Sequence, residues 1–562
     1  MSTARKVLSN TIWQMIGRFT MAILAIATVK IATNYLSLEG YGQYAVVYEF
    51  LAFFSIAADM GLFTIAVKEM SEDESQTEKI IGNILSLRTI LVVAMMTLAV
   101  IAVFLIPKYD KTYIPLGVAI ASFSVLFTLL NGTISSVLQA RLKMHISSIS
   151  QVIGKMAMIL YMLYIVFIAY PNTAPAGLSA LVGATGAAAT ALPDALASTA
   201  AAGATAAAGV TAAATALPGA LGFYHLIIAG VIGNLIMVLI TQYHVRKITP
   251  LNYKFDWQLW KKVLLKALPY GTALILSTIY FRIDSILLSL IRTQQEVGIY
   301  SVALRILEAF QIIPLYFMNS VLPVLTKAIK TSIGSTKDMA GQAAEQATEK
   351  ARLIVRYSFD FLVALGAPLL VGAYVLAYPI IFIVSSPQFL SRIDEGFYGS
   401  DIALKYLMFA LVFQFLGTLF TFLLLSINQQ SKILYINLGC VIFKITADLL
   451  VIPTYGFRGA ALTSIVAEFL VMSIGALIAY KYFKYRLSPT TTVKIIISAL
   501  VMGVTVKLLQ PLSYTLLQNA GVFLLVIIGA LVYGAMLLLT GAISKDMLKM
   551  LKKTPAESRP SI

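Results

Sequence analysis

The sequence predicts an all-α polytopic membrane protein, and three observations support this fold class. The 562 residues are 59% hydrophobic and 12% charged, whereas soluble domains average about 45–50% apolar and about 25% charged residues. The apolar residues form runs that can cross a hydrocarbon core of about 30 Å as helices, without the period-two alternation of a membrane barrel. The basic residues lie mainly in the connections between these runs.

The apolar runs give about 14 transmembrane helices. They are predicted at residues 11–33, 44–66, 84–106, 114–139, 148–170, 223–242, 264–290, 299–325, 357–384, 404–427, 432–452, 459–480, 491–510 and 519–541. The first run lacks a small-residue cleavage site, which favours a retained helix over a signal peptide.

The distribution of basic residues predicts the orientation. The formal net charge is +17, but the basic residues are dispersed among short connections, which argues against nucleic acid as the partner. Connections on one side carry most of the Lys and Arg residues. Those on the other side carry only Lys108, Lys111, Arg292, Arg392 and Arg458. By the positive-inside rule, both termini are predicted to be cytoplasmic.

Two stretches are not predicted to span the membrane. Residues 326–356 are charged and amphipathic, and are expected to form a cytoplasmic interfacial helix. Residues 173–222 are Ala-rich, repeat the letters ATALP and contain no Lys or Arg. They are interpreted as a low-complexity insertion on the outside, with an extracytoplasmic gating loop as the alternative.

An internal repeat predicts the domain organisation. The segments LSLEGYGQYAVVYEF (36–50) and TQQEVGIYSVALRILEAF (293–310) align Gly42 with Gly298 and Tyr44 with Tyr300. Glycine would permit a tight turn there, and internal duplication around a central site is common in transporters. The predicted division is a first six-helix lobe at 1–242, a cytoplasmic linker at 243–263, a second lobe at 264–480, and two further helices with a basic tail at 481–562.

Three stretches together resemble a known family. They are YLSLEGYGQYAVVYEFLAFFSIAADMGLFTIAVKEM, ALPYGTALILSTIYFRIDSILLSLIRTQQEVGIYSVALRILEAFQIIPLYFMNSVLPVL and ADLLVIPTYGFRGAALTSIVAEFL. In order and spacing they resemble the polysaccharide-biosynthesis flippases (Wzx-like) of the multidrug/oligosaccharidyl-lipid/polysaccharide superfamily. The resemblance implies two pseudo-symmetric lobes around a central cavity in the plasma membrane. It also implies movement of a polyprenyl-pyrophosphate-linked oligosaccharide to the outer leaflet by alternating access, with a glycan polymerase or glycosyltransferases as partners.

Charged residues inside the predicted spans are the candidate site, because a charge at mid-bilayer costs at least about 2.5–3.5 kcal/mol. Arg282 and Asp284 are two residues apart, so a helix directs them to roughly opposite sides. Other charges have structural alternatives. Arg305 and Glu308 are three residues apart, and Lys444 and Asp448 are four apart, as in intrahelical pairs. Arg18 and Asp59 are predicted at matching depth on adjacent helices, where they could bridge the first two spans.

We expect four cations to line the cavity and hold the pyrophosphate, since guanidinium groups match phosphate oxygens. These are Arg18, Lys155, Arg282 and Arg305. Other charged residues are candidates for charge balance or for coupling to Na⁺ or H⁺. These are Glu49, Asp59, Asp284, Glu308, Lys444 and Asp448.

Three other functions are less favoured by the sequence than a flippase. An ion-coupled exporter of organic cations would need unpaired acids, whereas the least explained charges here are basic. A membrane enzyme using the same lipid-linked donor would need catalytic groups in a sizeable outside loop. A scaffold would not need buried charges.

The three His residues are scattered and Cys440 is the single Cys, so no metal site is expected. The sequence has no GxxxxGK[ST] loop, so neither nucleotide use nor a cofactor is expected.

Overall fold

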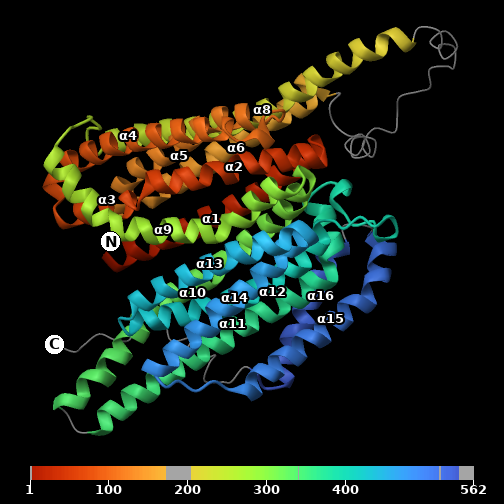
Figure 1. The fold of residues 1–562 in the computed structure, drawn as a ribbon. Helices are drawn as coiled ribbons and strands as arrows, with labels where there is room; N and C mark the ends of the chain where they lie inside the picture. Colours follow the sequence, from red (N-terminus) through yellow and green to blue (C-terminus); the bar gives the residue numbers. More distant parts are fainter. Residues whose placement is uncertain (1–2, 172–203, 339–340, 518–520, 543–562) are drawn as a thin grey trace. The chain divides into compact units, whose positions relative to one another are not determined.

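The computed structural model describes residues 3–171, 204–338, 341–517 and 521–542, which are almost entirely helical (Figure 1). In these residues no strand is formed beyond one isolated bridge between Arg392 and Phe397. The helices up to the middle of the chain are α1 (Thr3–Tyr35), α2 (Leu38–Asp59), α3 (Leu62–Glu72), α4 (Thr77–Phe104), α5 (Ile114–Ala140), α6 (Met144–Tyr164), α8 (Ala204–Arg246) and α9 (Trp257–Ile291). The later helices are α10 (Gln294–Asp338), α11 (Gly341–Val384), α12 (Ser400–Ser426), α13 (Gln430–Tyr455), α14 (Phe457–Tyr482), α15 (Pro489–Leu517) and α16 (Gly521–Leu539).

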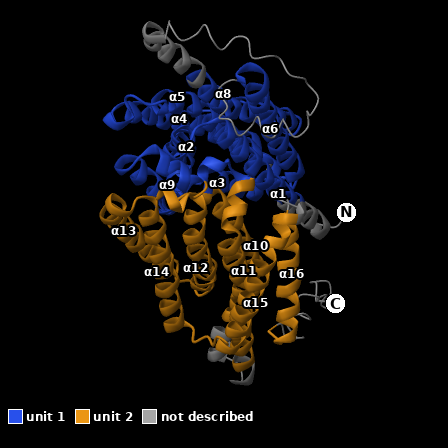
Figure 2. Ribbon diagram, turned by 90° about the vertical axis from the view of Figure 1, so that its right-hand side faces the viewer, with its two compact units in different colours: residues 1–302, 384–389 blue, residues 303–383, 390–562 orange. Residues whose placement is uncertain are grey.

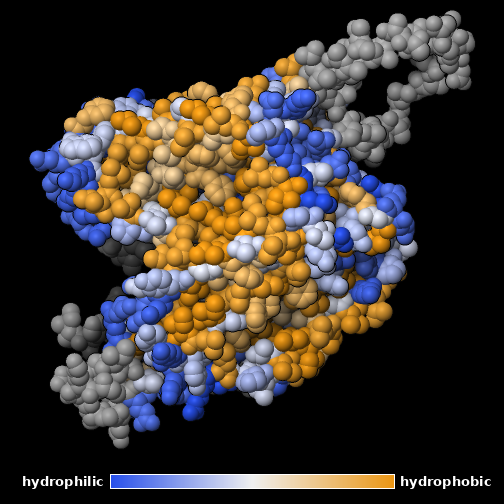
Figure 3. Space-filling model, in the orientation of Figure 1, coloured by the Kyte–Doolittle hydropathy of each residue, from blue (hydrophilic) through white to orange (hydrophobic). Residues whose placement is uncertain are grey.

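The predicted number of spans is confirmed, because 14 helical stretches among the described residues are long and apolar enough to cross a membrane. Helices α2 and α3 together make one of these stretches, Leu38–Glu72. On the face shown in Figure 3, hydrophobic side chains cover the middle of the helices and hydrophilic ones gather towards helix ends. This is the surface that a bilayer requires of a helical membrane protein.

The chain forms two compact units, shown in different colours in Figure 2. Unit 1 comprises residues 1–302 and 384–389, and unit 2 comprises residues 303–383 and 390–562. In unit 1, α5 packs against α4 and α8, α6 against α1 and α8, and α2 against α9. In unit 2, α14 packs against α12 and α13, and α15 against α16. Helix α9 therefore belongs to unit 1. The internal repeat instead predicts that α9 begins the second lobe, at residue 264, and that division into lobes stays a prediction.

The short segment 384–389 belongs to unit 1 because it is hydrogen-bonded to the end of α1. The Gln388 amide donates to the carbonyls of Thr33 at 2.9 Å and Leu36 at 2.8 Å. The Lys30 ammonium donates to the Ser385 carbonyl at 2.5 Å. The ring of Phe389 meets the ring of Tyr41 edge-on, with centroids 5.5 Å apart.

Two helices, α2 and α9, begin with a side chain that caps the helix N-terminus. Ser37 caps α2 by accepting the Gly40 amide at 3.0 Å. Asp256 caps α9 by accepting the amides of Gln258 and Leu259 at 3.1 Å. The Leu259 amide, together with Lys79, holds the pKa of Asp256 below its ordinary value. These caps satisfy amides that have no partner within their own helix.

The repeat glycines do not make turns, contrary to the sequence expectation. Gly42 lies in the first turns of α2 and Gly298 in the first turns of α10, and within unit 1 the two backbones pack against each other. A Cβ on Gly42 would lie 1.7 Å from the Gln294 carbonyl oxygen, and one on Gly298 would lie 2.6 Å from that of Leu38. Glycine is required here because two helices approach too closely for a side chain.

Two connections differ from the sequence expectation. Residues 326–338 continue α10 and residues 341–356 belong to α11, so they extend spanning helices instead of forming a separate interfacial helix. Helix α8 begins at Ala204, so residues 204–222 of the low-complexity stretch are helical. The rest of that predicted insertion, 173–203, lies outside the described residues.

Candidate functional site: charges buried within each unit

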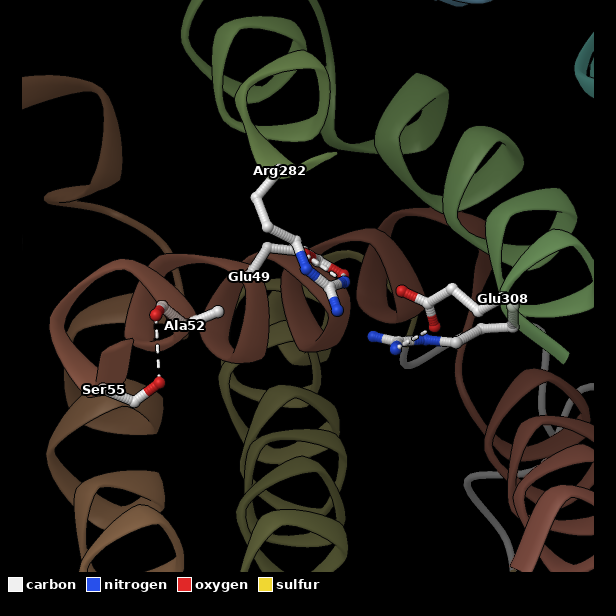
Figure 4. Close-up of polar contacts among 6 residues, drawn as sticks. Glu49, Ala52, Ser55, Arg282 and Glu308 are labelled. Atoms are coloured by element: carbon white, nitrogen blue, oxygen red, sulfur yellow. Dashed lines mark hydrogen bonds and ion pairs between the residues drawn. The ribbon is translucent and has the colours of Figure 1, made fainter. Parts of the chain in front are cut away.

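Arg282 is held by a carboxylate from another helix. Its Nη1 donates to both carboxylate oxygens of Glu49, at 2.7 and 2.9 Å. Figure 4 shows the Arg282 side chain reaching from α9 to Glu49 on α2. The Glu49 side chain is 2% exposed, whereas that of Arg282 is 27% exposed. Glu49 therefore fixes a guanidinium group that remains partly accessible, and α2 packs on α9 around this pair.

Asp284 points to a different neighbour, as its spacing from Arg282 predicts. Its carboxylate is buried and accepts a hydrogen bond of 2.8 Å from the Tyr300 hydroxyl on α10. Tyr300 is also buried, and it is the tyrosine that the internal repeat aligns with Tyr44. The two charges of this α9 stretch thus serve different contacts within unit 1.

In unit 2, Arg305 forms the intrahelical pair that its spacing allows. Its Nη1 lies 2.8 Å from a carboxylate oxygen of Glu308, which is labelled in Figure 4. Both side chains are about one-third exposed, at 31% and 30%. Arg305 therefore has a local counter-charge and remains accessible.

Asp59 does not bridge to Arg18, contrary to that sequence expectation. Its carboxylate is paired with Arg88 of α4, and the residue Arg18 is exposed. Arg88 was missed as a candidate, although it lies in a predicted span and its side chain is only 2% exposed. The signal was available, because Arg88 interrupts the apolar run LSLRTILVV in the way that Arg282 interrupts its own.

The other candidates lie in separate places. Lys155 of α6 is half-buried, and its ammonium lies 3.4 Å from the Met158 sulfur. In unit 2, Lys444 and Asp448 are both buried on α13, where Asp448 accepts a hydrogen bond from the Thr463 hydroxyl of α14. Unit 1 contains Arg18, Lys155 and Arg282, and unit 2 contains Arg305. That these four cations line one cavity stays a prediction.

A bundle with these spans and with ionisable side chains buried between its helices has the architecture of a polytopic membrane transporter. The family model described as polysaccharide biosynthesis protein matches residues 7–193 and 194–329. The chain belongs to this family. A search of curated proteins by sequence gives no match.

Solved structures share the fold at low sequence identity. A structure described as lipid II flippase MurJ in an inward closed conformation has a TM-score of 0.61 and 16% identity, covering 96% of this chain and 100% of that one. An inward-facing multidrug resistance MATE family transporter of the MOP superfamily has a TM-score of 0.54 and 14% identity, covering 82% and 94%. An outward-facing MATE transporter has a TM-score of 0.52 and 15% identity, covering 85% and 95%. The chain therefore shares the fold of these flippase and MATE transporter structures.

Proposed function

We propose that the protein is a flippase that moves a polyprenyl-pyrophosphate-linked oligosaccharide from the inner to the outer leaflet by alternating access. The family match supports a role in polysaccharide biosynthesis, and the likeness to a structure described as a lipid II flippase supports a lipid-linked substrate. The proposal includes a plasma-membrane location, with a glycan polymerase or glycosyltransferases as partners.

The observation that carries the proposal is the Arg282–Glu49 pair. An arginine inside a spanning helix is costly, and it is expected to face a partner or a water-filled path. Here the buried Glu49 carboxylate orients the guanidinium, while 27% of the Arg282 side chain stays accessible. A fixed, permanently charged planar group suits the oxygens of a pyrophosphate. We assign Arg282 as the first phosphate ligand, with Arg18, Lys155 and Arg305 as further cations along the path.

An exporter of organic cations is the second candidate, because the MATE structures share the fold. Such a site needs acids that are available to a cationic ligand. In unit 1 the three acids of the predicted set already have donors: Glu49 has Arg282, Asp284 has Tyr300 and Asp59 has Arg88. This arrangement favours an anionic substrate over a cationic one.

The direct experiment measures transbilayer movement of a fluorescent polyprenyl-pyrophosphate oligosaccharide in proteoliposomes. We expect movement with the wild type and background movement with Arg282→Ala. Arg282→Lys keeps the charge but loses the planar fork. We expect it to weaken binding by about 1.5–3 kcal/mol, roughly ten- to a hundredfold. Arg392→Ala, which breaks an exposed pair with Glu395, is the matched control. Efflux of an organic cation by the wild type, without lipid movement, would establish the exporter instead.

Energy for directional transport is proposed to come from a Na⁺ or H⁺ gradient or from consumption of the product, since the sequence carries no nucleotide-binding loop. We propose that charge balance or coupling to the ion falls to the remaining charged residues of the spans, which are Glu49, Asp59, Asp284, Glu308, Lys444 and Asp448. Collapsing each gradient in turn during the lipid assay distinguishes these sources.

A further inference from the structure

Helices α2 and α3 are separated by an interruption inside one apolar stretch. Helix α2 ends at Asp59, and the next two residues, Met60 and Gly61, have positive φ angles of 42° and 74°. The Met60 amide donates to the Ile56 carbonyl, and the next ladder begins with the Thr64 amide on the Gly61 carbonyl. The whole stretch is apolar enough to span a membrane. Backbone groups that leave the helical hydrogen-bond pattern here must therefore find partners in protein or in water.

A buried guanidinium group lies beside this interruption. Arg88 of α4 donates through Nη2 to the Asp59 carboxylate, and its side chain is 2% exposed. Its Nε and Nη1 are also buried, and no group of the described residues hydrogen-bonds to either atom. Leaving a buried donor unsatisfied costs about 1–3 kcal/mol, and more for a charged group.

A buried acceptor lies on the helix that faces Arg88. A Cβ on Gly132 of α5 would lie 3.9 Å from Arg88 Nη2, so the guanidinium sits against this turn of α5. The preceding residue, Asn131, is 4% exposed, and its Oδ1 is buried without a hydrogen-bond partner among the described residues. Arg88 therefore has two unused donor atoms, and the turn of α5 against which its guanidinium packs carries one unused acceptor atom.

The chemistry of these atoms selects the ligand. Asp59 already neutralises Arg88, whose side chain is 2% exposed where that of Arg282 is 27% exposed, so a bound anion would bring an uncompensated charge into a site closed to bulk solvent. The guanidinium would repel a cation, and an apolar group would leave all three atoms unsatisfied. Water both donates and accepts, and buried waters characteristically make two to four such bonds, roughly three on average.

We propose that Arg88 and Asn131 bind ordered water at the α2–α3 interruption. This water completes the hydrogen bonds of the Arg88 guanidinium and the Asn131 carbonyl. It also offers hydrogen bonds to the first amides of α3, for which a helix supplies no acceptor of its own. The site is distinct from the Arg282–Glu49 pair and does not depend on which substrate the protein carries.

Radiolytic hydroxyl-radical labelling of the full-length wild-type protein tests this site, because bound water generates radicals that oxidise adjacent side chains. The reporter is Met60, which is partly buried, and the reference is Met70, which lies 1% exposed in the apolar core of the same unit. Because Met60 is the more exposed of the two, the deciding comparison is Met60 in the wild type against Met60 in Asn131→Leu. We expect Met60 to be oxidised several-fold faster than Met70. In Asn131→Leu, which removes the acceptor at similar volume, that excess should be lost. Equal rates at Met60 and Met70 in the wild type, or an excess at Met60 that persists in Asn131→Leu, would overturn the proposal.

A second measurement needs only the wild type, so it stands even where the variant does not fold. The protein is mixed with H₂¹⁸O immediately before irradiation. Tyr253, an exposed residue between α8 and α9, should take up ¹⁸O at once from bulk solvent, whereas Met60 should acquire mainly ¹⁶O from slowly exchanging bound water. Uptake of ¹⁸O at Met60 as fast as at Tyr253 would show bulk access and contradict a bound-water site.

Discussion

At the scale of residues, charges within the spans are stabilised by partners on other helices. Arg282 meets Glu49 across α9 and α2, and Arg88 meets Asp59 across α4 and α2. Neither pair lies at helical spacing, so neither partner could be assigned from sequence position alone. The Arg305–Glu308 pair could be, because three residues bring side chains together on one helix.

The Asp59–Arg88 pair makes a stability prediction. Asp59→Ala leaves the buried Arg88 without its counter-charge, and removing one member of a buried pair typically costs about 3–5 kcal/mol. We expect a clear fall in the thermal unfolding temperature in detergent. Asp59→Leu with Arg88→Met, which removes both charges, should recover most of that loss. Glu72→Ala, which breaks the exposed Lys68–Glu72 pair, should change little. An Asp59→Ala protein as stable as the wild type would show that the pair carries no stability.

At the scale of elements, the spans were predictable and their interruptions were not. Runs of apolar residues specify spanning helices because each must satisfy its own backbone within the bilayer. The α2–α3 interruption depends on the left-handed Met60, which carries no sequence signature, and on packing by α9. There, a Cβ on Gly271 would come within 3.1 Å of the Met60 Cα. The contact of Gly42 with Gly298 was not predictable either, because it forms only where the two repeat segments pack against each other.

The helix contact at Gly42 is expected to tolerate no side chain. In Gly42→Ala the added Cβ would overlap the Gln294 carbonyl, and overpacking typically costs about 1–3 kcal/mol. We expect lower thermal stability. Gly439→Ala, within α13, is the control, since nothing lies within 4 Å of its added Cβ. That substitution should be neutral or stabilising by about 0.5–1 kcal/mol, as for an unhindered helical glycine. Equal behaviour of the two variants would contradict the close approach.

At the scale of the whole molecule, the charge asymmetry of the connections predicts the orientation. On a Cys440→Ala background, which removes the single cysteine, Lys111→Cys should react with a membrane-impermeant maleimide in intact cells. Lys247→Cys should react only after the membrane is opened. Both positions are exposed. The reverse pattern would place the termini on the outside and invert the predicted topology.

The sequence predicts the class of protein, but it predicts the residues of the site only in part. Composition and apolar runs predict a helical membrane protein. The family match and the shared fold agree with the resemblance to polysaccharide-biosynthesis flippases. Arg282 and Glu49 are each predicted as site residues from their charge within an apolar run, but their pairing is not predicted, and neither is the role of Arg88. Pairing across helices depends on their rotation and packing, which one sequence does not encode in any local pattern.

The central claim is that Arg282 binds the phosphate of the substrate and does more than stabilise Glu49. The most direct test is lipid movement by the double variant Arg282→Ala, Glu49→Ala, compared with Arg282→Ala alone. Removing both members relieves the cost of an unpaired Glu49. We therefore expect the double variant to regain thermal stability while lipid movement stays at background. Recovery of lipid movement together with stability would show that the pair is structural, and would contradict a phosphate-binding role for Arg282.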